Sequence, residues 1–213
     1  MQLLKSFLLL AAVCVAVASH GQKEEGAIAV NAGVGYSFFG LLGSLNFSVQ
    51  DEFEIEGKAT PVYTGAIDYG FDNNISIGLG GGYQAVSQNI KNYSYIDANG
   101  NETTSSFKYE ISRLNLGLRA LYHFGNGKID AYSGAKIGMN YYSVDVETKD
   151  VDNPSWLRTG GTSFGFQLIP IGVRAYVSNN LGIFFETGVG APCFISGGIC
   201  LGFGEDRSGN STN

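Results

Sequence analysis

The stretch Arg113-Leu-Asn-Leu-Gly-Leu-Arg-Ala-Leu-Tyr-His123 decides the fold. Its residues alternate between two faces, and this period of two is typical of a β-strand. One face carries Leu114, Leu116, Leu118, Ala120 and Tyr122, and the other carries Arg113, Asn115, Gly117, Arg119 and His123. The alternation therefore predicts a strand with one apolar face and one face of glycine, polar and charged residues.

Similar alternation recurs along the chain, in segments that are separated by turn signals. Eight strands are predicted in all, at Ala27–Tyr36, Pro61–Phe71, Ile75–Ser87, Tyr109–Phe124, Ile129–Val144, Ser163–Val177, Leu181–Gly190 and Phe194–Phe203. Asn126-Gly127 is a strong hairpin signal. A slip of the alternation around Pro170 predicts a β-bulge. The order of the segments predicts an all-β protein, an antiparallel up-and-down barrel of eight strands.

The connections between these segments alternate between long and short. Long ones are expected at about 37–60, 88–108 and 145–162, and short ones at 71–74, 125–128, 178–180 and 190–193. Short turns at one end and long polar loops at the other are typical of a transmembrane barrel of the outer membrane. We expect the long loops to face outside and to carry the function. Phe38–Leu45, in the first loop, either extends the first strand or packs across the mouth.

The charged residues of the predicted strands share a face with the glycines. They are Asp68, Arg113, Arg119, Asp130, Lys136, Arg174 and Glu186. A dry soluble core would not hold them, because an unpaired buried ion costs several kcal/mol. In a membrane barrel of eight strands the lumen is narrow and filled by side chains, so these ions can pair there while the apolar face meets lipid. We interpret the seven residues as a structural charge network; a gate or selectivity ring is the alternative.

Composition narrows the class of protein further. The chain has 213 residues, of which 31 are Gly, 44% are hydrophobic and 15% are charged. This is enough for one domain and too apolar for a disordered chain. The net charge of −6 provides no basic surface, so we expect no nucleic-acid partner.

The first residues have the pattern of a secretory signal peptide. Lys5 precedes an apolar run from Phe7 to Val17, and small residues follow that allow cleavage after Ala18 or after Gly21. Cys14 offers a lipoprotein alternative, which Val13 disfavours. We therefore divide the chain into a signal peptide at 1–21, a barrel domain at 22–203 and a polar tail at 204–213.

The stretch Pro170-Ile-Gly-Val-Arg-Ala-Tyr-Val-Ser-Asn-Asn-Leu-Gly-Ile-Phe-Phe-Glu-Thr-Gly-Val-Gly190 and the last strand, Ile195-Ser-Gly-Gly-Ile-Cys-Leu-Gly-Phe203, resemble a known family. They are similar to the small eight-stranded outer-membrane barrels of the OmpA, OmpX and opacity-protein type, in their Bacteroidetes variety. The resemblance implies that the terminal aromatic, Phe203, is a recognition signal for the barrel-assembly machinery. Residues 204–213 depart from the family pattern, in which the chain commonly ends at that aromatic.

Little in the sequence points to catalysis. After the signal peptide there is one histidine, His123, at the end with the short turns and without a nearby Ser. No metal-ligand spacing is present, and we interpret the acidic loop residues as solvated surface rather than as a Ca²⁺ site. Cys193 and Cys200 are expected to be free thiols, because a disulfide would need a turn at Gly197-Gly198. We expect no enzyme, no cofactor and no metal.

The sequence thus predicts a non-enzymatic barrel of the cell outer membrane with a structural or surface-interaction role. Its expected partners are outer-membrane lipid, the barrel-assembly machinery during insertion, and an unidentified extracellular or envelope protein. Three alternatives stay open: a transport or binding barrel for a small apolar ligand, a lipid-modifying outer-membrane enzyme, and a soluble lipocalin-like barrel.

Overall fold

The computed structural model describes residues 25–49, 53–72, 74–96, 100, 102–124, 128–148 and 159–204. Its elements are β1 (Ile28–Tyr36), α2 (Phe38–Gly43), β2 (Phe47–Val49), β3 (Phe53–Ala59), β4 (Val62–Asp72), β5 (Ile75–Ile96), β6 (Glu102–His123), β7 (Ile129–Thr148), β8 (Thr159–Tyr176), β9 (Leu181–Thr187), β10 (Val189–Gly190) and β11 (Ile195–Phe203). The expected signal peptide and nearly all of the expected polar tail lie outside the described residues.

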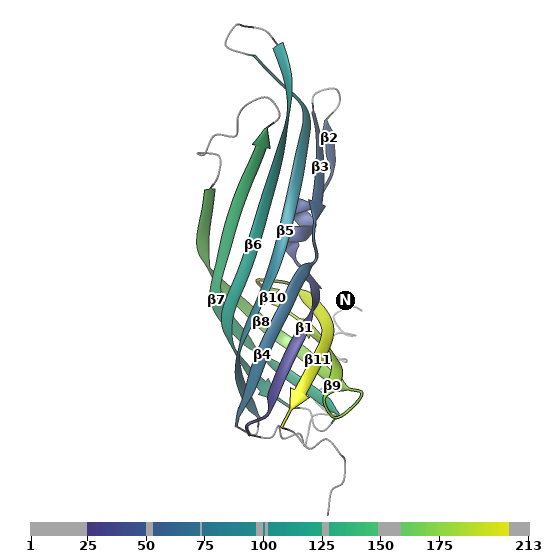
Figure 1. Ribbon diagram of the computed structural model, residues 1–213, viewed down its shortest axis with the longest axis vertical. Helices are drawn as coiled ribbons and strands as arrows, with labels where there is room; N and C mark the ends of the chain where they lie inside the picture. Colours follow the sequence, from purple (N-terminus) through teal and green to yellow (C-terminus); the bar gives the residue numbers. More distant parts are fainter. Residues whose placement is uncertain are drawn as a thin grey trace, which may run out of the picture.

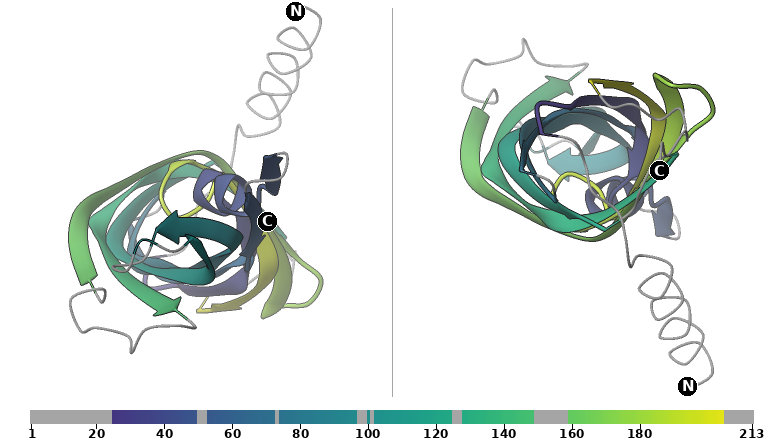
Figure 2. Two further views of the ribbon diagram at one scale, coloured as in Figure 1. Left: turned by 90° about the horizontal axis from the view of Figure 1, so that it is seen from above. Right: turned by 90° about the horizontal axis from the view of Figure 1, so that it is seen from below.

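The described strands close into a ring. Going around it, the eight members are β1, β4, β5, β6, β7, β8, β9 and β11, each antiparallel to the next, and β11 pairs with β1 (Figure 2). These strands correspond to the eight predicted segments in chain order. The predicted eight-stranded antiparallel barrel is confirmed. No helix in the described part of the chain is long and apolar enough to span a membrane.

The two faces of the ring differ as the alternation predicts. On the outside, Ile67, Leu118 and Ile183 are 55%, 63% and 59% exposed. On the inside, Asp68 and Arg174 are fully buried. An outer surface of this kind is unfavourable in water and favourable in hydrocarbon, whereas the charged side chains of the interior lie away from lipid, inside the lumen.

The predicted bulge lies in β8. Tyr132 pairs with Gly172 and Gly134 pairs with Ile169, so two residues of β8, Pro170 and Ile171, face one residue of β7. Pro170 has no N–H to offer the ladder, and a bulge is where a sheet tolerates this. The extra residue shifts the alternation of β8 by one position, so that Arg174 faces the lumen. The predicted bulge is confirmed.

Strands β5, β6 and β7 run far beyond the closed part of the ring (Figure 1). The prediction of long loops at 88–108 and 145–162 is wrong over much of these ranges: β5 continues to Ile96, β6 begins at Glu102, β7 reaches Thr148 and β8 begins at Thr159. The first loop, 37–60, holds α2, β2 and β3. The pairing of β5 with β6 extends to Ile96 and Glu102, and the pairing of β6 with β7 extends to Phe107 and Thr148.

The outward face changes character part-way along these three strands. The outward residues Tyr83, Leu114 and Tyr141 are paired in one row, and the next outward row is Ala85, Ser112 and Ser143. Above it, outward positions carry Lys91, Lys108, Glu110, Asp145 and Glu147. Apart from Gln88, the inward positions carry mainly apolar residues, among them Val86, Ile90, Tyr109, Ile111, Val144 and Val146. The upper part therefore has the polarity of a soluble barrel, apolar inside and polar outside.

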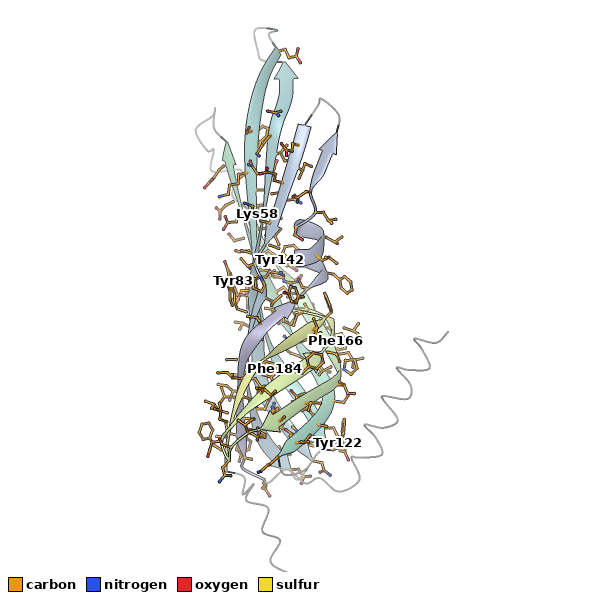
Figure 3. The ribbon with its side chains drawn as sticks, turned by 90° about the vertical axis from the view of Figure 1, so that its right-hand side faces the viewer. Lys58, Tyr83, Tyr122, Tyr142, Phe166 and Phe184 are labelled. Carbon is orange, nitrogen blue, oxygen red and sulfur yellow. The ribbon has the colours of Figure 1, made fainter. Side chains whose placement is uncertain are left out.

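This exchange locates the upper membrane boundary. Lipid favours apolar outward residues and water favours polar ones, so the boundary lies between the Tyr83 row and the Ser112 row. In Figure 3, Tyr122 lies near the lower end, Tyr83 near the middle and Lys58 above it. Long segments face outside the cell in such barrels, so we expect the sheet above Tyr83 to be extracellular.

The helix α2 closes part of the extracellular mouth. Ser37 caps it: its Oγ accepts a hydrogen bond from Gly40 N at 2.9 Å and donates one to Gln84 Oε1 at 2.6 Å. A Cβ at Gly40 would clash with Gln84, and one at Gly43 would clash with Val86. Of the two expectations for Phe38–Leu45, packing across the mouth is the one that the structure bears out, because α2 lies on the inner face of β5.

Candidate functional site

The candidate site is the charge network that fills the lumen. Asp68, from β4, is its centre: Oδ1 lies 2.9 Å from Arg119 Nε, and Oδ2 forms an ion pair with Arg174 Nη2. Arg174 also donates through Nη1 to Asp130 Oδ2 at 3.0 Å. Both Asp68 and Arg174 are fully buried, so oppositely charged side chains from other strands, rather than water, balance their charges.

Glu186, from β9, extends the network across the barrel. Its Oε1 accepts hydrogen bonds from Arg119 Nη2 at 2.6 Å and from Tyr132 Oη at 2.7 Å. The Tyr132 ring also lies under the Arg174 guanidinium, with 4.5 Å from its Cζ to the ring centroid. Charge-assisted bonds of this kind are about twice as strong as neutral ones and tie opposite walls together.

A second arrangement lies at the lower end, where Ser76, His123 and Asp130 meet. Ser76 Oγ is 2.8 Å from His123 Nε2, and His123 Nδ1 is 2.7 Å from Asp130 Oδ1. This has the connectivity of a Ser-His-Asp triad. Ser76 is fully buried and His123 is 1% exposed, and Asp130 is already paired with Arg174. In this state a substrate has no access to the Ser76 hydroxyl, so the arrangement acts as a buried hydrogen-bonded brace.

Sequence reasoning missed Ser76. The expectation that His123 lacks a nearby serine is wrong in space, because Ile75 pairs with Tyr122 and this places Ser76 diagonally next to His123 on the inward face. Parity placed both side chains on the inward face, but the register that brings them together depends on where the distant connection between the two strands turns.

The last two predicted residues, Arg113 and Lys136, bind neutral oxygens. Arg113 Nη2 donates to Pro192 O at 2.6 Å and to Gln84 Oε1 at 3.3 Å. Lys136 Nζ donates to Asn115 Oδ1 at 2.5 Å. The structure thus places all seven predicted residues inside the barrel and joins Asp68, Arg119, Asp130, Arg174 and Glu186 in one network, which excludes Arg113 and Lys136.

The segment after β9 closes the lumen from above. Gln167 Nε2 donates to Cys193 O at 2.9 Å, and a Cβ on Gly82 would lie 3.0 Å from Pro192 Cγ, so residues 191–193 cross from β8 to β5. We call these residues the mouth plug. The Arg113 guanidinium lies 5.0 Å from the Phe39 ring of α2 and holds the plug through Pro192. Cys193 and Cys200 are buried and are not joined in a disulfide, as expected.

The network can pair ions and hold opposite walls together. Among the residues with assigned positions, no group of three or more His, Cys, Asp or Glu is arranged to hold a metal ion. The network and the mouth plug fill the lumen at two levels.

Comparison with known proteins identifies the class of barrel. Residues 6–189 match the family described as "Outer membrane protein beta-barrel domain". The chain belongs to this family. The outer-membrane location and the resemblance to small outer-membrane barrels are thereby confirmed, and the soluble lipocalin-like alternative is set aside. No curated protein sequence matches the chain.

Solved structures of outer-membrane proteins have a similar arrangement. The N-terminal β-barrel domain of Pseudomonas aeruginosa OprF has a TM-score of 0.47 and 13% identity, covering 85% of this chain and 100% of that one. Pseudomonas aeruginosa OprG has a TM-score of 0.49 and 11% identity, covering 89% and 100%. Ail, the attachment invasion locus protein of Yersinia pestis, solved with the heparin analogue sucrose octasulfate, has a TM-score of 0.39 and 9% identity, covering 84% and 96%.

Phe203, the residue expected to signal barrel assembly, is the last residue of the outer-membrane barrel's final strand. It is 46% exposed and pairs with Ile28. Its position is that of an outward aromatic at the lower rim.

Proposed function

We propose that this outer-membrane barrel is a non-enzymatic, non-conducting protein with a structural or surface-interaction role, carried by the extracellular sheet above the Tyr83 row. The single observation that carries the proposal is the polarity exchange on β5, β6 and β7. It gives the sheet an apolar interior with Val86 and Val146 only 4% and 6% exposed, and a polar outer face. Such a sheet is a stable platform in water, whereas simple loops would move.

The charged outer face of this sheet is the part that a partner outside the cell would meet. Its outward positions are Glu54, Glu56, Lys58, Lys91, Lys108, Glu110, Asp145 and Glu147. Charges on an exposed face favour rapid and selective encounters rather than high affinity. Outer-membrane lipid remains the proposed partner of the lower outer face, and the barrel-assembly machinery that of Phe203.

A shortened barrel tests where the function lies. Gln88 pairs with Tyr109, so residues 89–108 can be replaced by a two-residue turn without breaking the ring. Cells that lack the protein would be complemented with either version, and leakage of a periplasmic marker and adhesion to surfaces would be measured. We expect the shortened barrel to insert and to restore the envelope barrier, but to lose adhesion. Full adhesion of cells that carry the shortened barrel would contradict the surface role.

Conduction and catalysis need separate tests. In planar bilayers we expect the intact barrel to show no steady conductance, because the network and the mouth plug fill the lumen. A serine-reactive fluorophosphonate is expected not to label the folded protein, since Ser76 is fully buried. His123→Gln is expected to leave membrane lipids unchanged. Labelling of wild type that is lost in Ser76→Ala would overturn the non-enzymatic assignment.

A groove on the lipid-facing wall favours a second candidate function, binding of a small apolar molecule. It has a volume of about 620 Å³, and Tyr63, Ile67, Leu79, Tyr83, Leu114 and Leu116 line it. It forms because Gly65 and Gly81 are directly opposite each other on β4 and β5 and leave the outer wall without side chains there. Apolar lining with few polar groups is usual for such ligands.

Filling the groove tests this candidate. A Cβ at Gly65 would have no heavy atom nearer than 3.8 Å, so Gly65→Leu projects into the groove without disturbing the ladder. Native mass spectrometry of the purified barrel is expected to show a bound apolar molecule that Gly65→Leu loses. Ala135→Leu, outward on β7, is the matched control and is expected to retain it. Retention by Gly65→Leu would refute the binding role.

A further inference from the structure

A small cavity lies in the lumen between the charge network and the mouth plug. Its volume is about 20 Å³. Arg119, Lys136 and Glu186 line it from the barrel wall, and Pro192 and Cys193 line it from the mouth plug. An internal space of this size holds about one water-sized species. A phosphate, a sugar or an apolar ligand does not fit, whereas a water or a monatomic ion does.

The cavity has a hydrogen-bond donor that lacks an acceptor. Asn31 lines it and is 3% exposed. Its Oδ1 accepts a hydrogen bond from Arg174 Nε at 3.2 Å, and this fixes the amide so that Nδ2 faces away from Arg174. Nδ2 is buried and has no hydrogen-bond partner in the part of the chain that the structure describes. An unsatisfied buried donor is destabilising, so an acceptor in the cavity is stabilising.

The buried charges around the cavity do not balance. Among the described residues the buried cations are Arg113, Arg119, Lys136 and Arg174, and the buried acids are Asp68, Asp130 and Glu186. Counting these seven residues alone, the cations exceed the acids by one. The acids are engaged by Arg119, Arg174, His123 and Tyr132.

Of the two buried cations outside the ion-pair network, Lys136 lines the cavity, whereas Arg113 does not. Lys136 takes part in none of the ion pairs found among the residues with assigned positions, and its ammonium donates to a neutral amide oxygen of Asn115. A buried ammonium without a counter-charge is unfavourable, and an anion of matching size offsets this cost. The Glu186 carboxylate also lines the cavity, but Arg119 and Tyr132 already bind its Oε1.

We propose that a single monatomic anion with the size and charge of chloride binds in this cavity, beside Lys136 and within reach of the Asn31 amide. The anion balances the buried charge of the lumen and satisfies the amide donor. It thereby stabilises the contact between the charge network and the mouth plug. The lining of the site includes no residue of the extracellular sheet, so a failed test of the anion would leave the proposed surface role unaffected.

Thermal unfolding of the purified full chain in detergent tests the site. The fraction that keeps the migration of the folded barrel on unboiled gels is measured against temperature in sodium chloride and in sodium gluconate of equal ionic strength. Gluconate is too large for the cavity, so the midpoint is expected to be about 3 °C or more higher in chloride. Lys136→Met is expected to lose this difference. Lys108→Met, on the exposed outer face, is the matched control and is expected to keep it.

Equal midpoints for wild type in the two salts would overturn the proposal and leave a water as the occupant. A second measurement needs no variant, and so stands even where Lys136→Met does not fold. Crystals of the wild-type protein grown in sodium bromide are expected to give an anomalous scattering peak inside the cavity. Peaks confined to the protein surface would show an adventitious ion only and would refute the site.

Discussion

Arg119 Nη2 lies 2.6 Å from Glu186 Oε1 and so joins strands β6 and β9, which are not neighbours in the sheet. The two side chains are only 5% and 9% exposed. Their contact crosses the lumen rather than running along a hydrogen-bonded ladder. It belongs to the interactions that fix the width of the barrel, and its removal leaves a buried charge.

Arg119→Met is expected to lower the free energy of unfolding by about 3–5 kcal/mol, because Glu186 then lies buried with Tyr132 as its remaining donor. Urea titration of the barrel in lipid vesicles measures this loss. The double variant Arg119→Met with Glu186→Met is expected to recover part of it, since both charges are gone. Lys108→Met, whose acidic neighbours are 3.6 and 3.7 Å away on the exposed face, is the control. A loss below about 1 kcal/mol in Arg119→Met would show that the pair is dispensable.

Gly172→Ala is expected to destabilise the barrel by about 1–3 kcal/mol. A Cβ at this position would lie 2.1 Å from Tyr132 Cε2, so the ring must leave its place under Arg174 and beside Glu186. The midpoint of heat-induced gel migration measures the change. Gly161→Ala in the same strand has no atom within 4 Å of the new Cβ and is expected to be neutral. Equal effects of the two substitutions would contradict the packing of Tyr132 on Gly172.

The membrane boundary predicts a contrast within one face of β6. Leu118→Arg, inside the apolar band, is expected to cost about 2–4 kcal/mol, because a charge there must leave water for hydrocarbon. Ser112→Arg, outward on the same strand but beyond the Leu114 row, is expected to cost about 0–1 kcal/mol. Unfolding in vesicles distinguishes the two. Similar losses of unfolding free energy in Leu118→Arg and Ser112→Arg would contradict a membrane boundary between the two residues.

The sequence predicts the strands of the ring well, but it predicts the contacts between side chains across the lumen poorly. Parity along β6 was sufficient to place Arg113 and Arg119 on one face and Leu118 on the other, because the period of a strand is two wherever it pairs. Which acid meets Arg119 depends on the stagger with which the ring closes, and this is set by all eight strand pairings together. The link from Arg119 to Glu186 was therefore not readable from spacing.

The extracellular sheet was missed for a different reason. An apolar outward face identifies membrane strands, and above the Ser112 row that face is polar, so the sequence pattern there predicts loops in place of strands. Ile111 and Val144 continue the period of two with the polarity of the faces exchanged. The short helix α2 has too few residues for a helical period to emerge, and its cap at Ser37 is the local signal.

The extracellular sheet also makes a titratable contact, between Glu56 of β3 and Lys91 of β5. Lys91 Nζ donates to Glu56 Oε1 at 2.6 Å, with both side chains partly exposed. The hydrogen bond and the charge of Lys91 lower the pKa of Glu56 below its usual value, and the hydrogen bond to Glu56 raises the pKa of Lys91. Exposed pairs of this kind contribute little stability.

The pair nevertheless predicts a measurable pH dependence. A carboxyl whose pKa is lowered by folding stabilises the sheet above its unfolded pKa, and the contribution is lost as the pH falls through the lowered folded value. In a pH titration of carboxyl ¹³C shifts, Glu56 is expected to titrate below an ordinary Glu, and Lys91→Met to move it back up. Lys58→Met, which removes a smaller charge effect, is expected to produce a smaller change. An unchanged Glu56 titration in Lys91→Met would show that β3 does not hold this register against β5 in solution, and that the sheet proposed to carry the surface role is looser than its strand pairing indicates.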